Sequence, residues 1–335
     1  MIEPGKPGAA EPPAGVHPQA WQRLKPHVQQ FLQGVQRKKR PAMQQLPIEL
    51  AREAYALSSC VLEPTPPALA RVQDLHILAN DGYAIPARLY AGREQGQGGL
   101  LPVLLYLHGG GFVVGSIDTH DVVCRRLCHA SGCAVVSVDY RLAPEHKFPT
   151  AFDDCWHSLQ WLAQHAATWG LDASRMAVGG DSAGGTLAAA CAVRAAQQDL
   201  PLRLQLLFYP GMQAEALTPS RTLYGNGFLL TEAQIQWMFQ TFVRNAADFA
   251  DWRFAPLHAD DVSGVAPLWM GLAECDPIVD DSLLWADKLR AAGVPVELEL
   301  YRGVVHEFIK LGRAMPEAEQ ALQDAAQALR QALQP

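Results

Sequence analysis

One short segment of the sequence is typical of a catalytic nucleophile. Ser182 is the centre of residues 180–184 (Gly-Asp-Ser-Ala-Gly), between the apolar run 176–178 and the alanine-rich stretch 186–196. The order strand, turn, helix holds a serine on a strained turn, where glycines avoid clashes. The following helix then points the positive end of its dipole toward the negative charge that develops during the reaction. We predict that Ser182 is a nucleophile for acyl transfer, supported by Asp181.

A glycine-rich loop supplies the second chemical feature. Residues 108–112 read His-Gly-Gly-Gly-Phe and directly follow the apolar run 103–107. Acyl transfer passes through an oxyanion, which needs N–H donors at about 2.7–3.1 Å, and glycines can turn their amides inward. The loop lacks the glycine motifs of nucleotide-binding proteins. The predicted donors are the N–H groups of Gly109, Gly110 and Ala183, and the predicted supports of the loop are His108 and Gly111.

The base and the acid can be predicted from their order along the chain. In the fold that has this kind of nucleophile turn, the serine comes first, the acid second and the histidine last. After Ser182 the sequence has only His258 and His306. His306 follows the apolar run 294–300, where reacting groups converge at strand ends, whereas His258 falls in a long interval without strand patterns. We therefore predict that His306 is the general base.

The predicted acid is Asp276, which ends the apolar run 268–273 and precedes Pro277. Asp280 and Glu274 remain alternatives, although Asp280 is placed as expected for an acidic residue at a helix start. In a serine–histidine–aspartate triad of this kind, Asp276 orients His306, and His306 takes the proton of Ser182 and returns it to the leaving group.

The elements that position these residues alternate along the chain. Two β-type runs, 72–78 and 84–90, flank Asn80-Asp81-Gly82 and predict a hairpin. Nearly continuous apolar runs then alternate with amphipathic helical stretches such as 152–167 and 283–292, up to a last helix after Pro316. This alternation predicts an α/β fold with a mostly parallel, doubly wound sheet.

Two helical regions lie outside this alternation and predict a cap over the strand ends. We expect residues 1–17 to be a flexible tail, 18–57 to form N-terminal cap helices and 211–255 to be a cap insertion. The catalytic domain would then consist of 58–210 and 256–335.

These motifs together resemble those of the bacterial hormone-sensitive-lipase-like carboxylesterases, from about Pro18 onward. The resemblance rests on residues 108–112, 140–149 with 153–154, 180–185, 276–278 and 306–308, in the order found in the family. It implies the α/β-hydrolase fold with an eight-stranded sheet and a helical cap. It also implies a preference for esters of short-to-medium acyl chains and the subgroup with Gly-Asp-Ser-Ala-Gly, in which the aspartate before Pro277 is the acid.

Three positions depart from the family pattern: Val279 where arginine is usual, Thr186 where asparagine is common, and Glu307 where glycine is frequent. Residues 140–149 match a structural signature of the family. We interpret Arg141, Glu145 and Asp154 as buried hydrogen-bonding supports for the nucleophile turn.

Aromatic and aliphatic residues are candidates for an ester pocket under the cap. The predicted lining is Phe31, Phe112, Tyr209, Phe228, Trp237 and Ile278. Trp21 and Phe239 are further candidates, and all the cap aromatics have the alternative of being core of the cap.

Composition and net charge argue against several other classes of protein. The chain has 335 residues and a formal charge of −7, which is too mild to indicate a nucleic-acid partner. No apolar stretch is long enough for a membrane span, and the first residues lack a signal-peptide pattern. Seven cysteines without metal-binding spacing indicate a reducing compartment, so we expect a cytoplasmic enzyme with no metal and no cofactor.

The leading prediction is a serine carboxylesterase that acts on a small-molecule ester through an acyl-serine intermediate. An amidase, a deacetylase or a lactonase would use the same triad, and these alternatives stay open. A ligand receptor of this fold is disfavoured, because such receptors dispense with the histidine that is present here as His306. A homodimer through the sheet edge is suggested by the resemblance alone.

Overall fold

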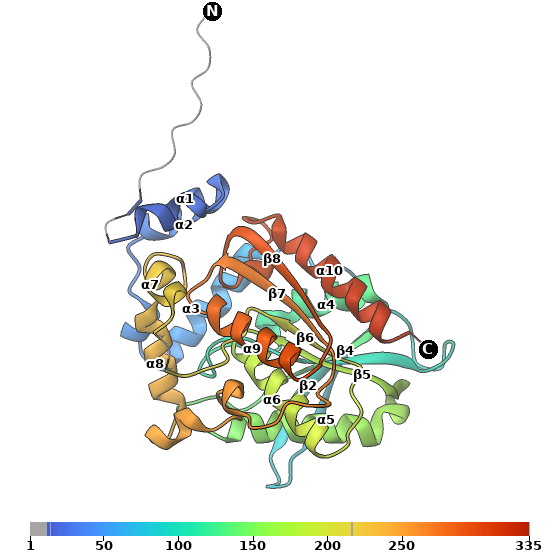
Figure 1. Cartoon of the computed structure of the whole chain (residues 1–335). Helices are drawn as coiled ribbons and strands as arrows, with labels where there is room; N and C mark the ends of the chain where they lie inside the picture. Colours follow the sequence, from blue (N-terminus) through green and yellow to red (C-terminus); the bar gives the residue numbers. More distant parts are fainter. Residues whose placement is uncertain (1–11, 14, 216, 335) are drawn as a thin grey trace, which may run out of the picture.

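The computed structural model describes residues 12–13, 15–215 and 217–334, and it contains one eight-stranded sheet with helices on both faces (Figure 1). Residues 1–11, which make up most of the predicted tail, lie outside the described residues. The strands are β1 (Arg71–Leu78), β2 (Ala84–Ala91), β3 (Leu101–Leu107), β4 (Ala134–Val138), β5 (Leu171–Asp181), β6 (Leu204–Phe208), β7 (Leu268–Cys275) and β8 (Val296–Val305).

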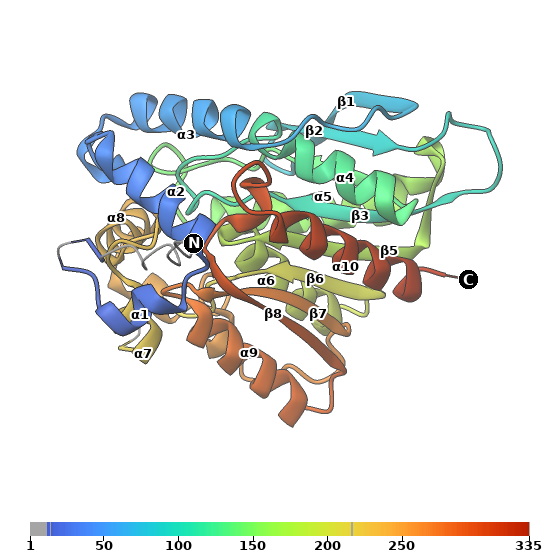
Figure 2. The ribbon, with the colours of Figure 1, turned by 90° about the horizontal axis from the view of Figure 1, so that it is seen from above.

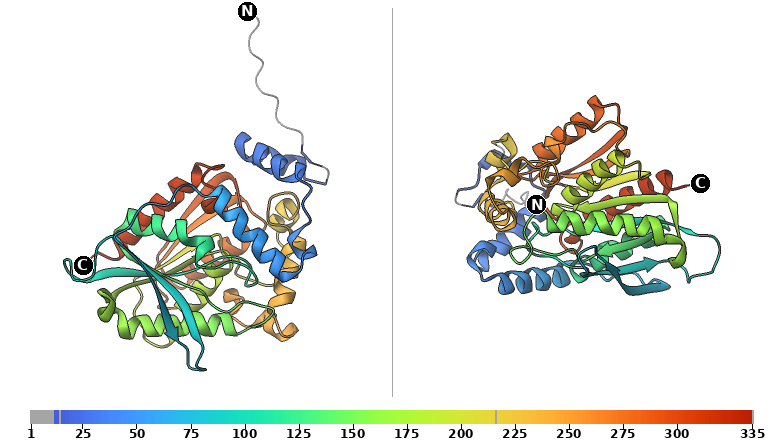
Figure 3. Two further views of the ribbon diagram at one scale, coloured as in Figure 1. Left: turned by 180° about the vertical axis from the view of Figure 1, so that it is seen from behind. Right: turned by 90° about the horizontal axis from the view of Figure 1, so that it is seen from below.

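The strand order is β1-β2-β4-β3-β5-β6-β7-β8. The hairpin β1–β2 pairs antiparallel and joins β4 antiparallel, whereas all pairs from β4 to β8 are parallel. Views from behind and below place this hairpin at one edge of the sheet (Figure 3). The predicted mostly parallel, doubly wound sheet is confirmed.

The parallel strands are apolar throughout because both of their faces are covered. In β3, Leu105 and Leu107 belong to the core on one face, and Leu104 and Tyr106 belong to the core on the other. Helices α4 (Asp121–Ser131) and α10 (Glu317–Ala332) cover the second face. Helices α5 (Thr150–His165), α6 (Ala183–Gln197) and α9 (Val279–Ala291) cover the first, as the view from above shows (Figure 2).

The two segments predicted to form a cap, 18–57 and 211–255, contain helices from two distant parts of the chain, and η5 (Pro256–His258) lies just beyond the second segment. The N-terminal elements are α1 (Pro18–Arg23), α2 (Pro26–Arg37), η1 (Met43–Gln45) and α3 (Ile48–Leu62), and the later ones are α7 (Pro219–Tyr224), α8 (Glu232–Phe242), η4 (Ala246–Ala250) and η5. The two groups meet where Arg23 donates a hydrogen bond to Tyr224 at 3.1 Å and where Trp21 packs edge-on against Phe228. Helix α3 continues past residue 57, the predicted end of the N-terminal cap helices, and ends at Leu62, with Glu63 as its C-cap residue.

Short 3₁₀ turns complete the fold: η2 (Asp118–His120) before α4, η3 (Ala166–Trp169) before β5 and η6 (Phe308–Lys310) after β8. Within the described ranges, no helix is both long enough and apolar enough to cross a bilayer.

Candidate active site

Ser182 occupies the turn between β5 and α6. Its backbone has φ 53° and ψ −122°, a conformation that L side chains rarely adopt. The Ser182 N–H donates to the carbonyl oxygen of Phe208 at 2.9 Å, which holds the turn in place. A Cβ at Gly180 or Gly184 would collide with the carbonyl oxygen of Leu107, so both glycines allow the turn to lie directly against β3.

Ser182, His306 and Asp276 meet at the carboxyl ends of the parallel strands. The Nε2 atom of His306 lies 2.9 Å from Oγ of Ser182, and its Nδ1 lies 2.6 Å from Oδ2 of Asp276. The other carboxylate oxygen, Oδ1 of Asp276, accepts the N–H of Ile278 at 3.0 Å. With the Nδ1 proton directed at Asp276, Nε2 is the acceptor for the serine hydroxyl.

Burial and charge act in opposite directions on His306. Burial alone would lower the pKa of this imidazole, but the nearby charge of Asp276 and its hydrogen bond outweigh burial. The pKa of His306 is therefore raised above its ordinary value, so its imidazole stays protonated up to a higher pH than an ordinary histidine does.

The alternative acids, Asp280 and Glu274, form their hydrogen bonds with other residues than His306. Asp280 lies in the first turn of α9 and accepts the N–H of Ser220 at 2.8 Å, and Glu274 accepts the N–H of Gly303 at 2.9 Å. His258 is the last residue of η5. Of the candidate acids, Asp276 is thus the one bonded to His306.

The glycine loop corrects one predicted oxyanion donor. The N–H of Gly109 donates to Oδ1 of Asp181 at 3.1 Å, so it is already bound to a carboxylate and does not face the serine. The prediction for Gly109 was wrong because the sequence does not show which glycine amide meets Asp181.

Gly110, Gly111 and Ala183 carry the remaining N–H groups of this region. Among the described residues, none of these three amides has a hydrogen-bond acceptor. Gly111 and Ala183 line the same cavity as Ser182. Gly111 has φ 59°, and a Cβ there would collide with the sulfur of Met238, so the backbone approaches the cap as closely as a glycine permits.

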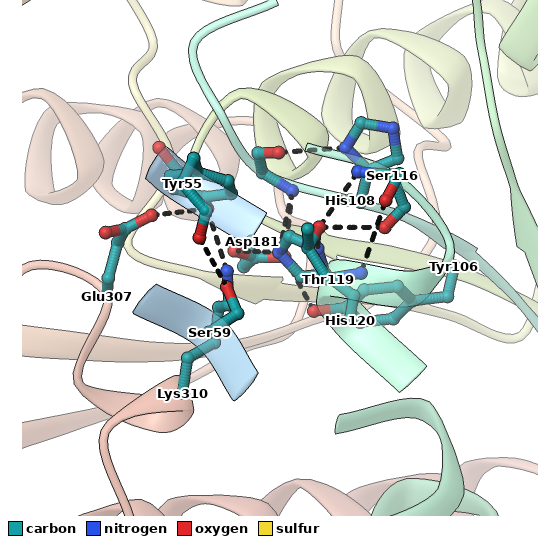
Figure 4. Close-up of polar contacts among 12 residues, drawn as sticks. Tyr55, Ser59, Tyr106, His108, Ser116, Thr119, His120, Asp181, Glu307 and Lys310 are labelled. Carbon is teal, nitrogen blue, oxygen red and sulfur yellow. Dashed lines mark hydrogen bonds and ion pairs between the residues drawn. The ribbon is translucent and has the colours of Figure 1, made fainter. Parts of the chain in front are cut away.

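Asp181 is the centre of a buried hydrogen-bonded cluster beneath the loop (Figure 4). Besides Gly109, its Oδ1 accepts the hydroxyl of Tyr106 at 2.7 Å, and its Oδ2 lies 3.3 Å from Nε2 of His120. Burial would raise the pKa of this carboxyl, but His120 and the hydrogen bonds hold it below its usual range. Asp181 therefore connects the nucleophile turn to the glycine loop.

His108 stabilises the loop from inside. Its Nδ1–H donates to the carbonyl oxygen of Gly109 at 2.8 Å, and its ring stacks on Tyr140 at 4.3 Å. Burial lowers the pKa of His108 to about 3, so it stays neutral.

The supports predicted from residues 140–154 are only partly buried. Asp154 is buried and bonds Arg141, with the Arg141 Nη2 to Asp154 Oδ1 distance at 2.6 Å. Glu145 is instead exposed and pairs with Arg52 of α3, so the prediction that it is buried was wrong. Arg52 also donates to the carbonyl oxygens of Val113 and Ala143. Glu145 is therefore connected, through Arg52, to the segment that follows the glycine loop.

A pocket that opens to solvent lies between Ser182 and helix α8, with about 450 Å³ of empty space when its open mouth is included. Its lining is mostly apolar: Gly111, Phe112, Ser182, Ala183, Thr186, Gly211, Gln213, Leu230, Ile235, Met238, Phe239, Phe254 and Ile278. Of the predicted lining, Phe112 and Ile278 are present, together with the further candidate Phe239.

The other four predicted lining residues lie elsewhere. Phe228 is buried against Trp21 and Tyr224 in the cap, and Phe31 packs in the same core. Trp237 packs on the main core, and Tyr209 is buried with its ring 4.7 Å from that of His306. For Phe31 and Trp237 the prediction was wrong because the helical pattern does not determine which face of α2 or α8 meets the cavity. Tyr209 follows β6 and Phe228 lies between α7 and α8, where the sequence has no periodic pattern to orient the side chain.

Several lining residues were not predicted. Leu230, Gln213 and Phe254 come from irregular stretches of the insertion, which show no periodic signal. Met238 and Ile235 carry such a signal, since both belong to the apolar pattern of α8.

The fold and this site define an α/β hydrolase. The family described as the alpha/beta hydrolase fold matches residues 104–310. The chain is 40% identical over 293 residues to an ethyl acetate hydrolase of Pseudomonas putida, covering 87% of this chain and 92% of that protein. It is also 40% identical over 270 residues to the carboxylic ester hydrolase LipN of Mycobacterium tuberculosis, covering 78% and 70%.

A solved structure of an ester hydrolase from the metagenome of Lake Arreo, complexed with a bipyridine phosphonate derivative, superposes with a TM-score of 0.88. That protein is 35% identical, and the match covers 92% of this chain and 98% of that one. The chain belongs to the α/β-hydrolase family, among the bacterial carboxylesterases that are similar to hormone-sensitive lipase. The prediction of an ester hydrolase is confirmed by these relatives.

Proposed function

We propose that this carboxylesterase hydrolyses its ester with Ser182 as nucleophile, His306 as general base and Asp276 as the residue that orients His306. The observation that carries the proposal is the continuous contact from Ser182 Oγ to His306 Nε2 at 2.9 Å and from His306 Nδ1 to Asp276 Oδ2 at 2.6 Å. This arrangement is the one that activates a serine hydroxyl in acyl transfer.

The steps follow from the positions of these groups. As Oγ of Ser182 attacks the ester carbonyl, its proton passes to Nε2 of His306, and the carbonyl oxygen becomes an oxyanion. The N–H groups of Gly110, Gly111 and Ala183 are the proposed donors to that oxygen. When the C–O bond to the alcohol breaks, His306 returns the proton to the leaving oxygen, and an acyl-serine remains.

Water completes the cycle. His306 takes a proton from water while the water oxygen adds to the acyl carbon. The second tetrahedral intermediate then collapses as its C–Oγ bond breaks and His306 gives the proton to Oγ of Ser182, which releases the acid and free Ser182. Each step needs only the three side chains and the donors named above.

The substrate proposal is a small ester with a short-to-medium acyl chain. The cavity wall is apolar and is bounded on the cap side by Met238, Phe239 and Phe254. An apolar wall of this kind favours hydrocarbon over charged groups. The named activity of the Pseudomonas putida relative on ethyl acetate is in line with a short acyl chain.

The decisive test is Ser182→Ala assayed with a short-chain aryl ester. We expect kcat to fall by at least about 10⁴-fold, because the nucleophile is lost. A serine-directed phosphonate should label the unmodified protein at Ser182 and leave the variant unlabelled. Retained hydrolysis in the variant contradicts the proposal. Parallel rates on anilides, acetylated sugars and lactones separate an esterase from the related hydrolases.

The domain division is also a proposal: residues 18–57 and 211–255 act together as the cap. The contacts of Arg23 with Tyr224 and of Trp21 with Phe228 support it. If the cap acts as a unit, Arg23→Ala should raise KM more than it lowers kcat.

Two further proposals concern the protein in the cell. All seven cysteines are free thiols, and six of them are buried, which supports a reducing, cytoplasmic environment. A homodimer through the exposed edge strand β8 is proposed from the family resemblance, and light scattering of the purified protein tests it.

A further inference from the structure

Glu307, the residue directly after His306, adopts an unusual backbone conformation. It has φ 63° and ψ 10°, in the left-handed region that favours glycine. This chain carries a glutamate at this position in place of the glycine that such a conformation favours. A side chain that costs conformational energy here needs a compensating interaction.

That interaction is a hydrogen-bonded chain to helix α3. The Tyr55 hydroxyl donates to Oε1 of Glu307 at 2.6 Å, and the ammonium of Lys310 donates to the Tyr55 oxygen at 2.9 Å (Figure 4). The Lys310 nitrogen also lies 4.2 Å from the centroid of the Tyr55 ring. Tyr55 and Lys310 are both buried, so these contacts are shielded from water.

Two of these residues, Glu307 and Lys310, also close the turn that follows His306. The backbone N–H of Lys310 donates to the carbonyl oxygen of Glu307 at 2.9 Å. Both ends of the segment 307–310 are thus bound to one tyrosine from the N-terminal cap. Because His306 is the residue next to this segment, the position of its imidazole depends on these contacts.

The charged groups around this cluster determine its effect on His306. The carboxylates that act on the imidazole come from three loops: Asp276 after β7, Asp181 at the end of β5 and Glu307 after β8. Burial raises the pKa of Glu63, the remaining acidic neighbour of Lys310, to about 8, so it is mostly neutral at pH 7. Asp181 and Glu307 are the other two carboxylates near the buried Lys310.

We propose that Glu307 is a positioning residue for His306, which anchors the histidine loop to Tyr55 and Lys310 and adds negative charge beside the imidazole. This inference rests on the proposed role of His306 as the base. It assigns two separable functions to one carboxylate, the anchoring of the loop and the electrostatic bias toward the protonated imidazole.

Two variants separate these functions. In Glu307→Gln the amide oxygen can still accept from Tyr55, but the charge is lost. We expect the midpoint of the acid limb of kcat/KM to move to lower pH by a few tenths of a unit, with the plateau rate little changed. In Tyr55→Phe the charge stays but the anchor is cut. We expect kcat to fall by roughly 10-fold with KM nearly constant, and the midpoint to stay close to its original pH.

Glu53→Gln is the matched control, because it removes the same charge from an exposed position on helix α3. Rates are expressed per active site titrated with a phosphonate, so that a loss of folded protein does not count as a loss of rate. An unchanged midpoint in Glu307→Gln, or an unchanged kcat in Tyr55→Phe, would overturn the proposal. Failure of the proposed function would look different, since hydrolysis would then persist in Ser182→Ala.

Discussion

The carboxylate of Asp181 binds the backbone N–H of Gly109 at 3.1 Å. Through this contact, the residue before Ser182 binds the first glycine of the loop, and the amides of Gly110 and Gly111 have no hydrogen-bond acceptor among the described residues. The loop and the nucleophile turn therefore form one rigid unit, although 72 positions separate the two residues. Such preorganised donors stabilise an oxyanion without reorganising during the reaction.

Removal of the Asp181 carboxylate should loosen the loop. We expect Asp181→Ala to lower kcat by about 10- to 100-fold, because Gly109, Tyr106 and His120 lose their common acceptor and the donors shift. Asp181→Asn keeps one acceptor oxygen and should retain more activity. Equal rates for the two variants would show that the contact does not position the loop.

Gly111→Ala tests the corrected oxyanion hole. The new Cβ would meet the Met238 sulfur, and φ 59° disfavours alanine, so the donor should move away. We expect a loss in kcat of about 100-fold or more, measured under saturating substrate. Gly34→Ala is the control, because no atom lies within 4 Å of its added Cβ in helix α2, and it should leave kcat within about twofold.

The acid is tested by a pair of substitutions. Asp276→Asn should lower kcat by about 10⁴-fold, since the amide cannot hold the imidazole in the required tautomer. Asp280→Asn, four residues away, removes a carboxylate that binds Ser220 instead of His306, and its rate should stay within a few-fold. The reverse ranking would move the acid to Asp280.

The pH profile of kcat/KM reports the ionisation of His306 in the free enzyme. His306 must be neutral to accept the serine proton, and the charge of Asp276 raises its pKa. Activity should therefore fall as pH decreases through a midpoint above about 6.5, the ordinary value for histidine. A profile that stays flat down to pH 5 would contradict the role of His306.

The depth of the cavity should depend on Met238, which lines it with its sulfur packed against Gly111. Met238→Ala removes three side-chain heavy atoms from the wall and should move the preferred acyl chain to longer esters. A rate panel from acetate to octanoate esters measures this shift. An unchanged order of rates would place the acyl chain outside this cavity.

The sequence alone predicted the mostly parallel sheet and the three residues, Ser182, Asp276 and His306, that the structure brings into contact, with Asp280 and Glu274 left as alternative acids. Strands buried on both faces appear as continuous apolar runs, and a serine turn or a histidine after a strand is marked by its immediate neighbours. These signals are local, so Ser182, Asp276 and His306 were predictable from the order of the runs and the residues that end them.

The tertiary structure alone decided which groups face the substrate. The choice between Gly109 and Gly111 depends on where Asp181 binds, and the cavity lining depends on how two cap segments pack, about 200 positions apart at Trp21 and Phe228. The pairing of Glu307 with Tyr55 is equally non-local. Contacts between distant segments leave no periodic pattern in a single sequence, because each side chain is placed by neighbours that only folding brings together.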